Sequence, residues 1–455
     1  MDFTKRDFKG MHVLVAGSGI SGVGAVKMLT KCNAAVTLYD GNDKLKKEDI
    51  EKKLGRNDVK IVLGELPQEV IDDNELMIIS PGIPIDAPFV NRVRESGVEI
   101  WGEIELAYQN SMGKLAAITG TNGKTTTTSL VGEIMKNTYK DVYVVGNIGT
   151  SYADVALDTT ADTVTVAEIS SFQLESAKDF HPDVTAVLNI TPDHLNRHYT
   201  MENYTNVKMS IAKNQTKDQI CVLNYDDEIL LTESNKIPAK PFFYSSRQSL
   251  NEGVCLDGED IVLRINGEEK KVCGIHDMKL VGIHNVENVM AAVAISYFMG
   301  AGLDIIRDTI RDFKAVEHRI EYVTEKNGVI YYNDSKGTNT DASIKAIEAM
   351  TRPTVLIAGG YDKGCEFDDW VKLFDGTVKC VVLIGATSQK IADTAKKYNY
   401  DSIIFADTLE DAVLKADEQA DSGDAVLLSP ACASWDMFKS YEERGRMFKE
   451  FVNNL

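Results

Sequence analysis

Short apolar runs recur along the chain, and most are followed by a glycine-rich or polar segment and then by a stretch with helical spacing. Such runs are typical of strands buried on both faces of a parallel sheet. They are His12–Ala16, Ala35–Tyr39, Val59–Val62, Leu76–Ser80, Leu115–Ile118, Val164–Ala167, Val184–Leu188, Val329–Tyr332, Val355–Ala358, Val381–Ile384, Ile403–Phe405 and Ala425–Leu428. The alternation of such strands with helices predicts an α/β fold.

The run Leu115–Ile118 leads into Gly120-Thr121-Asn122-Gly123-Lys124-Thr125-Thr126 and then into a helical pattern. This is the layout of a phosphate-binding loop, in which backbone N–H groups and the helix N-terminus face the phosphates. Lys124 would neutralise the phosphates, and Thr125 would bind Mg²⁺. The first glycine comes later than in the general pattern, so the loop is a shortened variant. A glycine turn that caps an ordinary helix is the alternative, and the Gly-Lys-Thr sequence favours an NTP site.

The first strand is followed by Gly17-Ser18-Gly19-Ile20-Ser21-Gly22, and Asp40 lies 18 positions after the last glycine, 40 minus 22. Read alone, this pattern indicates dinucleotide binding and an oxidoreductase. The same crevice serves other nucleotides, however, and a fold does not determine a function. Ser80-Pro81-Gly82 ends a later strand at the sheet edge where ligands of open α/β folds bind.

Polar side chains end two further buried runs near the phosphate loop. Glu168 ends one run, and Asp193 and His194 follow another. A carboxylate and an imidazole at these places would hold Mg²⁺ or orient a substrate. The alternatives are a helix cap for Glu168 and an ordinary interior position for His194, but two such residues beside one phosphate loop favour the site.

Two later helical segments contain further residues that could belong to a binding site. In the helical stretch Met201–Ile211, Lys208 neighbours an apolar stripe, and the pattern alone indicates a surface lysine beside a core face. Asn285 and Asn288 lie one turn apart at the start of an apolar helix. Carboxamides pair well with the edge of adenine, although Asn285 also suits a helix N-cap.

A second α/β series begins after residue 314, and polar clusters again follow its strands: Asn333–Lys336, Gly359–Lys363 and Ser429–Asp436. A chain of 455 residues is too long for one core. We therefore predict a Rossmann-like domain over residues 1–102, a central P-loop ATP-binding domain over 103–314, and a Rossmann-like domain over 315–455.

Composition narrows the class of protein. Asp and Glu outnumber Lys and Arg by 69 to 49, a net charge of −20, which argues against a nucleic-acid-binding surface. The seven cysteines include no C-x-x-C pair, which suits a reducing compartment and argues against a zinc site or a disulfide framework. The first seven residues lack the features of a signal peptide, and no apolar run approaches membrane-spanning length. We expect a cytoplasmic protein without a membrane partner.

The motifs together resemble the Mur ligases of peptidoglycan synthesis. The resemblance rests on the phosphate loop, Glu168–Ser171, Asp193-His194-Leu195, His284-Asn285 with Asn288, and His318-Arg319. Gly17–Gly22, Ser80–Ile83, Asn333–Lys336 and Ser429–Asp436 resemble the branch of the family that adds D-glutamate. The Asp-Asn-Pro-Arg signature of the diaminopimelate-adding branch is absent. Asn196 stands where the family more often has aspartate, so we assign it no role.

The resemblance implies roles for named residues, and three of them differ from the pattern alone. Gly17–Gly22 with Asp40 would hold a uridine diphosphate rather than NAD, Lys208 would carry a CO₂-derived carbamate that binds Mg²⁺, and Arg319 would reach the ATP phosphates. The implied catalytic residues are Lys124, Glu168, His194, Lys208 and Arg319. The implied metal ligands are Thr125, Glu168, His194 and carbamylated Lys208. The implied ATP-binding residues are Gly120, Thr121, Asn122, Gly123, Lys124, Thr125, Thr126, Asn285, Asn288, Arg319 and Asp334. The implied UDP-substrate residues are Ser18, Gly19, Ile20, Ser21, Asp40, Ser80, Pro81, Gly82, Asn147, Ser170 and His194. The implied D-glutamate residues are Lys336, Thr338, Lys363, Ser434, Trp435 and Tyr441.

The implied reaction joins D-glutamate to UDP-N-acetylmuramoyl-L-alanine. ATP, with Mg²⁺, would phosphorylate the alanine carboxylate, and the D-glutamate amine would then displace phosphate. The enzyme is expected to be a monomer. Three alternatives stay open: another Mur-type amino-acid ligase, an NAD-dependent oxidoreductase, and a nucleotide-gated binding protein without catalysis.

Overall fold

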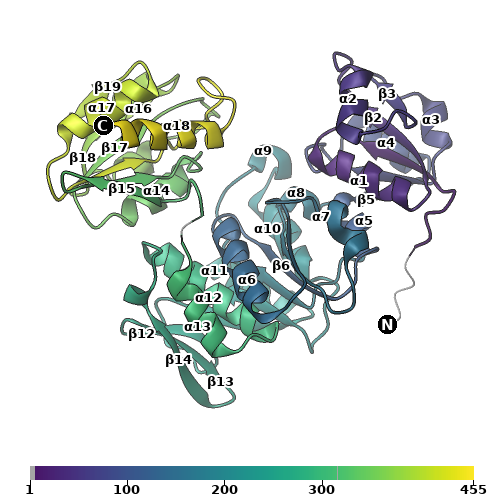
Figure 1. Cartoon of the computed structure of the whole chain (residues 1–455), viewed down its shortest axis with the longest axis horizontal. Helices are drawn as coiled ribbons and strands as arrows, with labels where there is room; N and C mark the ends of the chain where they lie inside the picture. The colour runs from purple at the N-terminus through teal and green to yellow at the C-terminus, as the bar shows by residue number, and fades with distance from the viewer. Residues whose placement is uncertain (1–5, 315) are drawn as a thin grey trace. The chain divides into compact units, whose positions relative to one another are not determined.

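The structure is a computed structural model that describes residues 6–314 and 316–455. The expectation about a signal peptide concerns a segment that lies mostly outside these ranges. Internal contacts divide the chain into two compact units. The first unit holds the chain up to Ile275 together with Asn288–Ile310, and the second holds His276–Glu287 together with Arg311–Leu455. Figure 1 shows three separate sheets along the described part of the chain, two in the first unit and one in the second.

The N-terminal sheet is parallel and has the strand order β3-β2-β1-β4-β5. Its elements are β1 (His12–Ala16), α1 (Ile20–Lys31), β2 (Ala35–Asp40), α2 (Lys47–Leu54), β3 (Lys60–Leu63), α3 (Gln68–Asp72), β4 (Leu76–Ile79), α4 (Pro88–Glu95) and β5 (Glu99–Gly102). The central strands are buried because helices cover both faces of the sheet. Since β1 and β4 are neighbours, the segments that follow them, Gly17–Gly22 and Ser80–Ile83, meet at one edge.

The central sheet has the order β14-β13-β12-β11-β10-β9-β6-β8-β7 and is parallel as far as β12. Its strands are β6 (Lys114–Thr119), β7 (Val142–Gly146), β8 (Val164–Glu168), β9 (Val184–Val187), β10 (Ile220–Asn224), β11 (Lys240–Ser245), β12 (Gly253–Asp257), β13 (Asp260–Ile265) and β14 (Glu268–Gly274). Its helices are α5 (Glu103–Tyr108), α6 (Lys124–Thr138), α7 (Tyr152–Val155), α8 (Ser171–Leu174), α9 (Leu195–His198), α10 (Met201–Met209), α11 (Glu228–Glu233), α12 (Ile283–Phe298) and α13 (Leu303–Asp312), with short 3₁₀ turns at Ala156–Asp158, Ser210–Ala212, Ser234–Lys236 and Ile275–Asp277. Because β6 lies between β8 and β9, the phosphate loop lies beside the ends of both neighbours.

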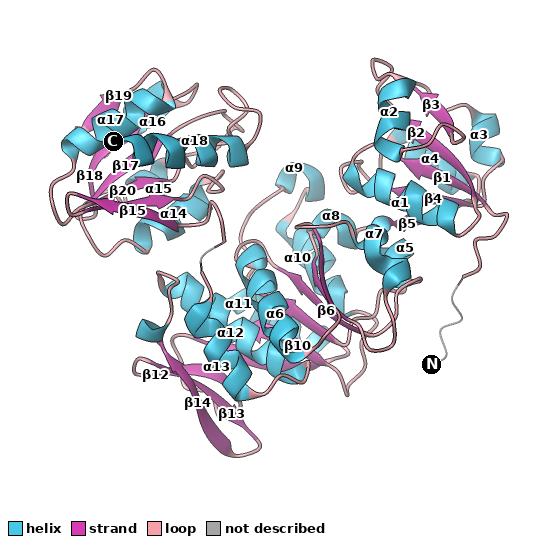
Figure 2. Cartoon of the chain, viewed as in Figure 1, coloured by secondary structure: helices cyan, strands magenta, loops and turns pink. Residues whose placement is uncertain are grey.

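The C-terminal sheet has the order β15-β16-β20-β17-β18-β19 (Figure 2). Its elements are β15 (Glu321–Lys326), β16 (Val329–Asn333), α14 (Thr340–Glu348), β17 (Thr354–Ala358), α15 (Asp368–Val371), β18 (Val378–Leu383), α16 (Ser388–Lys397), β19 (Ile403–Phe405), α17 (Leu409–Gln419), β20 (Ala425–Leu428) and α18 (Tyr441–Asn454). Only β15 is antiparallel to its neighbour in the described part of this sheet. The last strand, β20, inserts between β16 and β17, so the loops after these three strands lie side by side.

The N-terminal and central sheets share one apolar core. Val13 and Val15 of β1 belong to the same buried cluster as Leu115 of β6 and Val145 of β7. The Gly102 N–H of β5 donates to the Ser176 carbonyl oxygen of the central part over 3.0 Å. Next to this contact, the Ser151 hydroxyl and the Ala153 N–H both donate to Glu103 Oε1, each over 2.7 Å. Burial raises the pKa of the Glu103 carboxyl. These two parts of the chain therefore form one continuous structure.

The predicted α/β class is confirmed, and each predicted apolar run overlaps a strand of the structure. The sequence pattern missed β5, β7, β10 to β14, and β15. The hairpin strands explain part of this failure, because β14 reads Glu268-Glu269-Lys270-Lys271-Val272-Cys273-Gly274 and its charged first half is mostly exposed. A charged strand of this kind carries no buried-run signal.

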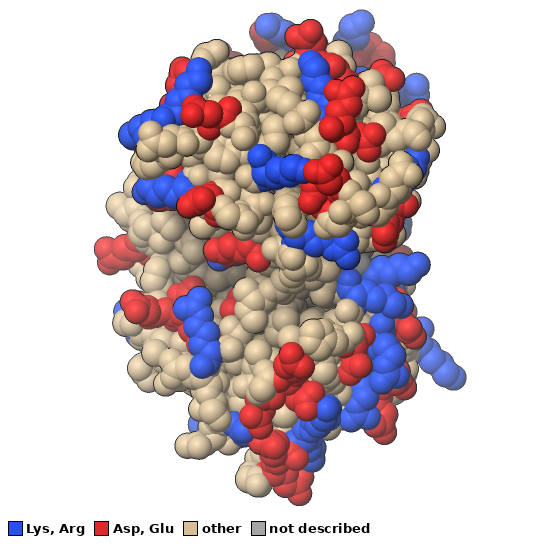
Figure 3. All heavy atoms as spheres, turned by 90° about the vertical axis from the view of Figure 1, so that its left-hand side faces the viewer, with Lys and Arg blue, Asp and Glu red and all other residues tan. Residues whose placement is uncertain are grey.

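Two surface findings bear on the expected partners. None of the helices in residues 6–314 and 316–455 is long and apolar enough to cross a membrane. On the face drawn in Figure 3, basic and acidic side chains are intermingled.

Candidate functional site

The phosphate loop has the predicted layout, with β6 before it and α6 after it. Gly123 is the N-cap of α6 and has a left-handed backbone, φ +82°. A Cβ at this position would lie 2.1 Å from Asn288 Oδ1, so only glycine lets the loop approach α12. Thr125 and Thr126 are buried in the first turn of α6. Lys124 Nζ donates to the carbonyl oxygens of Gly120 and Thr121 over 2.8 and 2.7 Å, so the lysine folds back over its own loop.

Lys208 lies beside this loop and is only 2% exposed, so its interpretation as a surface lysine is wrong. Its Nζ donates to the Gly120 carbonyl oxygen over 2.7 Å. Burial, together with the nearby positive charge of Lys124, lowers the pKa of Lys208 well below its usual value, although Asp193 and Glu168 oppose the shift. The structure therefore brings Lys124, Lys208, Glu168 and Asp193 into one electrostatic neighbourhood.

Glu168 is the last residue of β8 and is 1% exposed. Its Oε1 accepts a hydrogen bond of 2.8 Å from Asn147 Nδ2. Its Oε2 is buried and has no hydrogen-bond partner within residues 6–314 and 316–455. A buried carboxylate oxygen without a donor is costly, and a bound cation would satisfy it. These residues fit a divalent metal ion. The cap of α8 is Ser170, which forms a capping box with Gln173, so the helix-cap alternative for Glu168 is wrong.

His194 is the N-cap of α9 and has a left-handed backbone, φ +53°. Its side chain is 48% exposed, which contradicts the alternative of an interior histidine. The ring lies 4.8 Å from that of Phe172, and Nε2 lies 3.4 Å from Asp193 Oδ2. The His194 side chain is therefore exposed in the segment that follows β9.

The crevice of the N-terminal sheet is formed by close backbone approach. A Cβ at Gly22 would lie 1.9 Å from the Gly17 carbonyl oxygen, and one at Gly17 would lie 2.6 Å from Ser80 Oγ. Ser18 donates to Asp40 Oδ2 through its N–H (2.9 Å) and its hydroxyl (2.6 Å). Burial alone would raise the pKa of Asp40, but these bonds and one from the Asn42 N–H lower it. Gly19 is the N-cap of α1, with Ser21 in its first turn and Ile20 80% exposed; Pro81 and Gly82 lie in the turn after β4.

In the C-terminal sheet, three predicted residues follow the three adjacent strands. Lys336 follows β16, Ser434 follows β20, and Lys363 follows β17. Lys336 Nζ lies 5.2 Å from the centre of the Tyr441 ring. The Tyr361 N–H donates to the Ala433 carbonyl oxygen over 2.8 Å and so joins the loops that carry Lys363 and Ser434. Lys363 is exposed, Ser434 is buried, Trp435 is 65% exposed, and Thr338 is partly buried ahead of α14.

Arg319 lies in a strained segment of the second unit. His318 before it and Ile320 after it have φ values of +67° and +43°, which are rare outside glycine. The Ile320 N–H donates to Asp334 Oδ1 over 3.3 Å, and Ser429 Oγ donates to Asp334 Oδ2 over 2.7 Å. Burial raises the pKa of Asp334 to about 7. Asn285, on the same unit, donates from Nδ2 to the Val281 carbonyl oxygen over 2.7 Å. Strain of this kind is typical of functional segments.

Comparison with known families accounts for most of the chain. The MurD-like N-terminal domain of Mur ligases matches residues 11–102, the Mur ligase middle domain matches 118–296, and the glutamate ligase domain of Mur ligases matches 318–432. The chain belongs to the Mur ligase family. Relatives in this family include the UDP-N-acetylmuramoylalanine–D-glutamate ligases of Lachnospira eligens and Lachnoclostridium phytofermentans. The Lachnospira eligens protein is 54% identical to this chain, over 99% of this chain and 100% of the relative. The Lachnoclostridium phytofermentans protein is 52% identical, over 99% of each chain.

Solved structures share the fold of this Mur ligase. A pseudomurein peptide ligase type C from Methanothermus fervidus aligns with a TM-score of 0.60 at 20% identity, over 98% of this chain and 100% of its own. The MurF ligase of Thermotoga maritima, solved with ADP, aligns with a TM-score of 0.61 at 18% identity, over 99% and 97%. Family membership disfavours the oxidoreductase interpretation of Gly17–Gly22.

Sequence reasoning missed Arg444, which organises the C-terminal loops of this Mur ligase. Arg444 is fully buried in α18. Its Nε donates to Ser335 Oγ (3.0 Å), and its Nη2 donates to the carbonyl oxygens of Ser335 (2.8 Å) and Cys432 (3.2 Å). Burial lowers the pKa of Arg444 to about 10. Arg444 lies on the same helical stripe as Phe448 and Val452, so spacing alone indicates that it faces the core. Spacing does not reveal which loop oxygens it binds.

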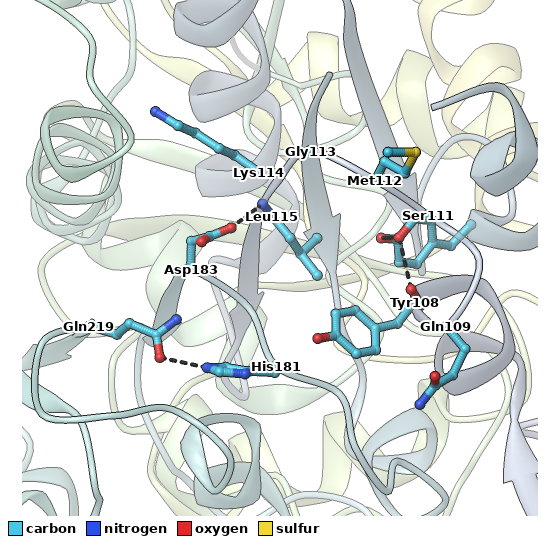
Figure 4. A pocket seen from close by; sticks show the side chains of 11 residues that line it. Tyr108, Gln109, Ser111, Met112, Gly113, Lys114, Leu115, His181, Asp183 and Gln219 are labelled. Carbon is cyan, nitrogen blue, oxygen red and sulfur yellow. Dashed lines mark hydrogen bonds between the residues drawn. The ribbon is translucent and has the colours of Figure 1, made fainter. Parts of the chain in front are cut away.

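A cavity of about 270 Å³ opens at the opposite edge of the central sheet (Figure 4). Its lining includes Lys114 at the start of β6, with Asp183 and Gln219 just before β9 and β10. Asp183 Oδ2 accepts from the Leu115 N–H over 2.8 Å, and His181 Nε2 lies 2.6 Å from Gln219 Oε1. Because these residues lie at the amino ends of the strands, the cavity is separate from the phosphate-loop edge.

Proposed function

We propose that this Mur ligase joins D-glutamate to UDP-N-acetylmuramoyl-L-alanine, with ATP converted to ADP and phosphate. The observation that carries the proposal is the identity of about half of all residues, over the full chain, with relatives named for this activity. The motif after β20 and the arrangement of Lys336, Ser434 and Lys363 support D-glutamate as the amino acid.

Phosphoryl transfer depends on positioning and charge neutralisation more than on covalent help. The backbone N–H groups of the phosphate loop would hold the nucleotide, and Lys124 would turn from its own carbonyls toward the phosphates. Mg²⁺, when bound, would neutralise charge on the phosphates, with Thr125, Glu168 and His194 as candidate ligands. The orphaned Glu168 Oε2 supports this assignment. Arg319 would supply a further positive charge from the second unit.

Lys208 would act as a carbamate rather than as a cation. A neutral amine attacks CO₂ and releases one proton, so the lysine gains a carboxylate. The lowered pKa of Lys208 supports this step because it makes the neutral amine available. The resulting carboxylate would add an oxygen ligand beside Glu168 and would remove the repulsion with Lys124.

The alanine carboxylate would attack the γ-phosphorus of ATP, giving an acyl phosphate and ADP. The D-glutamate amine would then attack the acyl carbon, lose a proton, and displace phosphate as the amide bond forms. D-glutamate carries two carboxylates, so its site needs two separated groups of donors. Lys336 and Lys363 would provide them, with Ser434 between.

The test is release of phosphate by the purified chain with ATP, Mg²⁺, D-glutamate and UDP-N-acetylmuramoyl-L-alanine, with the product identified by its mass. Release should require all substrates and should fail with L-glutamate, because inversion of the α-carbon misplaces the amine or a carboxylate. Lys124→Ala is the matched inactive control. Release that is independent of D-glutamate, or faster with another amino acid, would refute the proposal.

A further inference from the structure

The segment that contains His194 also reaches across to the N-terminal sheet. Arg197 Nη2 donates to the Ile83 carbonyl oxygen over 2.8 Å, and the Tyr199 hydroxyl donates to Asp86 Oδ2 over 2.6 Å. Both acceptors follow β4, in the loop that begins with the Ser80–Gly82 turn. The Ile83 N–H closes this turn on the Ser80 carbonyl oxygen over 3.0 Å, so a bond to the Ile83 carbonyl oxygen acts on the turn itself.

Arg197 is held in one direction by several contacts. Its Nε and Nη2 both donate to Glu175 Oε2, over 3.2 and 2.5 Å, and its guanidinium lies 4.9 Å from the centre of the Phe172 ring. The side chains of Arg197 and Glu175 are only 12% and 9% exposed. A guanidinium bound by two groups of its own domain presents its other N–H donors in fixed directions.

Glu175 and His198 tie this arginine to the catalytic edge of the central sheet. Glu175 Oε1 lies 3.3 Å from His198 Nδ1, and His198 Nε2 lies 3.0 Å from Ser171 Oγ. The His198 ring packs against Tyr204, whose hydroxyl lies 3.1 Å from Thr121 Oγ1 in the phosphate loop. The contacts therefore run without a break from the Ser80–Ile83 turn to the phosphate loop.

The backbone of this segment is strained at both ends. His194 has φ +53°, and Tyr199 has φ +66° with ψ −46°, outside the left-handed helical region. Non-glycine residues keep such conformations only where the surroundings impose them. The four-residue helix α9 between them joins His194 at one end to the contacts with the N-terminal loop at the other.

We propose that Arg197 and Tyr199 are positioning residues that fix the Ser80–Ile83 turn relative to His194 and the phosphate loop. This inference rests on the proposed function, in which one substrate has its uridine diphosphate in the N-terminal crevice and its reacting carboxylate beside the phosphate loop. The Arg197–Ile83 and Tyr199–Asp86 contacts would set the distance between the sites that hold these two ends of the substrate. A shift of about 1 Å in such a separation lowers turnover on the order of 100-fold.

Steady-state kinetics on Arg197→Gln and Tyr199→Phe test the proposal. For Arg197→Gln, we expect kcat/KM for the UDP-precursor to fall about 10- to 100-fold, with KM for ATP and the Kd for UDP alone within about 3-fold of wild type. Under the proposed function, UDP alone would contact only the N-terminal crevice, so its Kd would not depend on the separation. Tyr199→Phe removes one hydroxyl from a side chain that is 68% exposed, and we expect a loss of about 2- to 10-fold. Arg197→Lys should recover part of the activity.

Lys178→Gln is the matched control. Lys178 Nζ donates to Glu99 of β5 over 2.5 Å, so it also joins the central and N-terminal sheets, but it does not contact the Ser80–Ile83 turn. We expect kcat/KM for the precursor to be unchanged in this variant. An equal loss in Lys178→Gln would show that any contact between the sheets suffices, and the proposal would be overturned.

Amide hydrogen exchange gives a readout that does not depend on the reaction. We expect the peptide that spans residues 80–87 to exchange faster in Arg197→Gln than in wild type or Lys178→Gln, whether or not the wild type turns over. Unchanged exchange, unchanged kcat/KM, or a loss of UDP affinity equal to the loss of kcat/KM would each overturn the proposal. If Arg197→Gln does not fold, Tyr199→Phe decides by the same criteria. Failure of the wild type to release phosphate would instead refute the proposed function.

Discussion

Lys208 Nζ donates to the Gly120 carbonyl oxygen over 2.7 Å, and that oxygen also accepts from Lys124 Nζ over 2.8 Å. Two ammonium groups on one acceptor in a buried site repel each other, since charges interact strongly where water is excluded. Burial and the charge of Lys124 lower the pKa of Lys208, with Asp193 and Glu168 acting in the opposite direction. The site therefore favours a Lys208 that is neutral or chemically converted to an anion.

We predict that Lys208→Ala lowers turnover on the order of 100-fold while nucleotide binding persists, because the carbamate would be lost but the phosphate loop would remain. Short carboxylic acids should restore part of the activity by occupying the space. Wild type in ¹³CO₂-enriched buffer should show a carbamate carbon signal that is absent from Lys208→Ala. Lys136→Ala, which removes an exposed lysine paired with Glu133, serves as the control. Near-normal turnover of Lys208→Ala would contradict the assignment.

Lys363→Ala should raise the half-saturation constant for D-glutamate about 10- to 150-fold, the value of a lost charge-assisted hydrogen bond. The constants for ATP and the UDP-precursor should stay nearly unchanged. Steady-state kinetics with each substrate varied in turn measure this. Lys372→Ala, which removes an exposed lysine paired with Asp369 in the same unit, is the control. A defect for ATP with normal saturation by D-glutamate would place Lys363 elsewhere.

The variant Ser80→Ala distinguishes an effect on UDP binding from an effect on the thermal stability of the protein. Ser80 Oγ is buried and has no hydrogen-bond partner among the described residues, so its removal should leave the thermal stability of the free protein equal or higher. If this hydroxyl binds the uridine diphosphate, the affinity for UDP should fall about 3- to 10-fold. Calorimetry on the full chain measures the binding of UDP and of NAD. We expect UDP to bind and NAD not to bind.

The full chain is required for this experiment because the N-terminal sheet shares its core with the central sheet. Ser296→Ala is the matched control, since Ser296 Oγ in α12 is likewise buried without a partner in the described ranges. Ser296→Ala should leave the affinity for UDP unchanged. NAD binding tighter than UDP would restore the oxidoreductase interpretation.

Some functional residues leave a signal in the sequence, and others do not. Buried parallel strands and glycine-rich turns have a signal in the sequence, so β6, the phosphate loop and the crevice after β1 were predicted from the sequence. The interpretation of Lys208 as a surface lysine fails because the buried face of its helix is wider than the apolar stripe. Tyr204 lies four residues earlier and is 1% exposed, so helical spacing places Lys208 on the buried side.

Arg444 and the Arg197 contacts were not predictable in the same way. Each depends on backbone carbonyl oxygens in loops outside its own helix: Ser335 and Cys432 for Arg444, and Ile83 for Arg197. Backbone acceptors leave no trace in residue type, because every residue carries the same carbonyl group. Tertiary structure is needed to find such positions.

The buried carboxyl of Asp334 should make the stability of the second unit depend on pH. Its pKa rises from 3.8 to about 7 because burial disfavours the charged form. Between about pH 4 and pH 7 the folded state retains a proton that the unfolded state has released, so stability falls as pH rises through this window and is flat above it. Asp334→Asn removes the ionisation, and we expect its melting temperature relative to wild type to increase from pH 4 to pH 7.

Thermal unfolding of both proteins at half-unit pH intervals measures the difference. Asp369→Asn is the control, because it makes the same change at a carboxylate that is 87% exposed and should give a difference that does not vary in this window. Asn at position 334 keeps an acceptor for the Ile320 N–H but loses the second carboxylate oxygen that binds Ser429. The loss of this bond changes the melting temperature of the variant by the same amount at every pH. The ionisation of Asp334 changes the melting temperature of the wild type only between pH 4 and pH 7. A constant difference across that range would mean that Asp334 is ionised throughout, with Arg319 and Arg444 compensating for its burial.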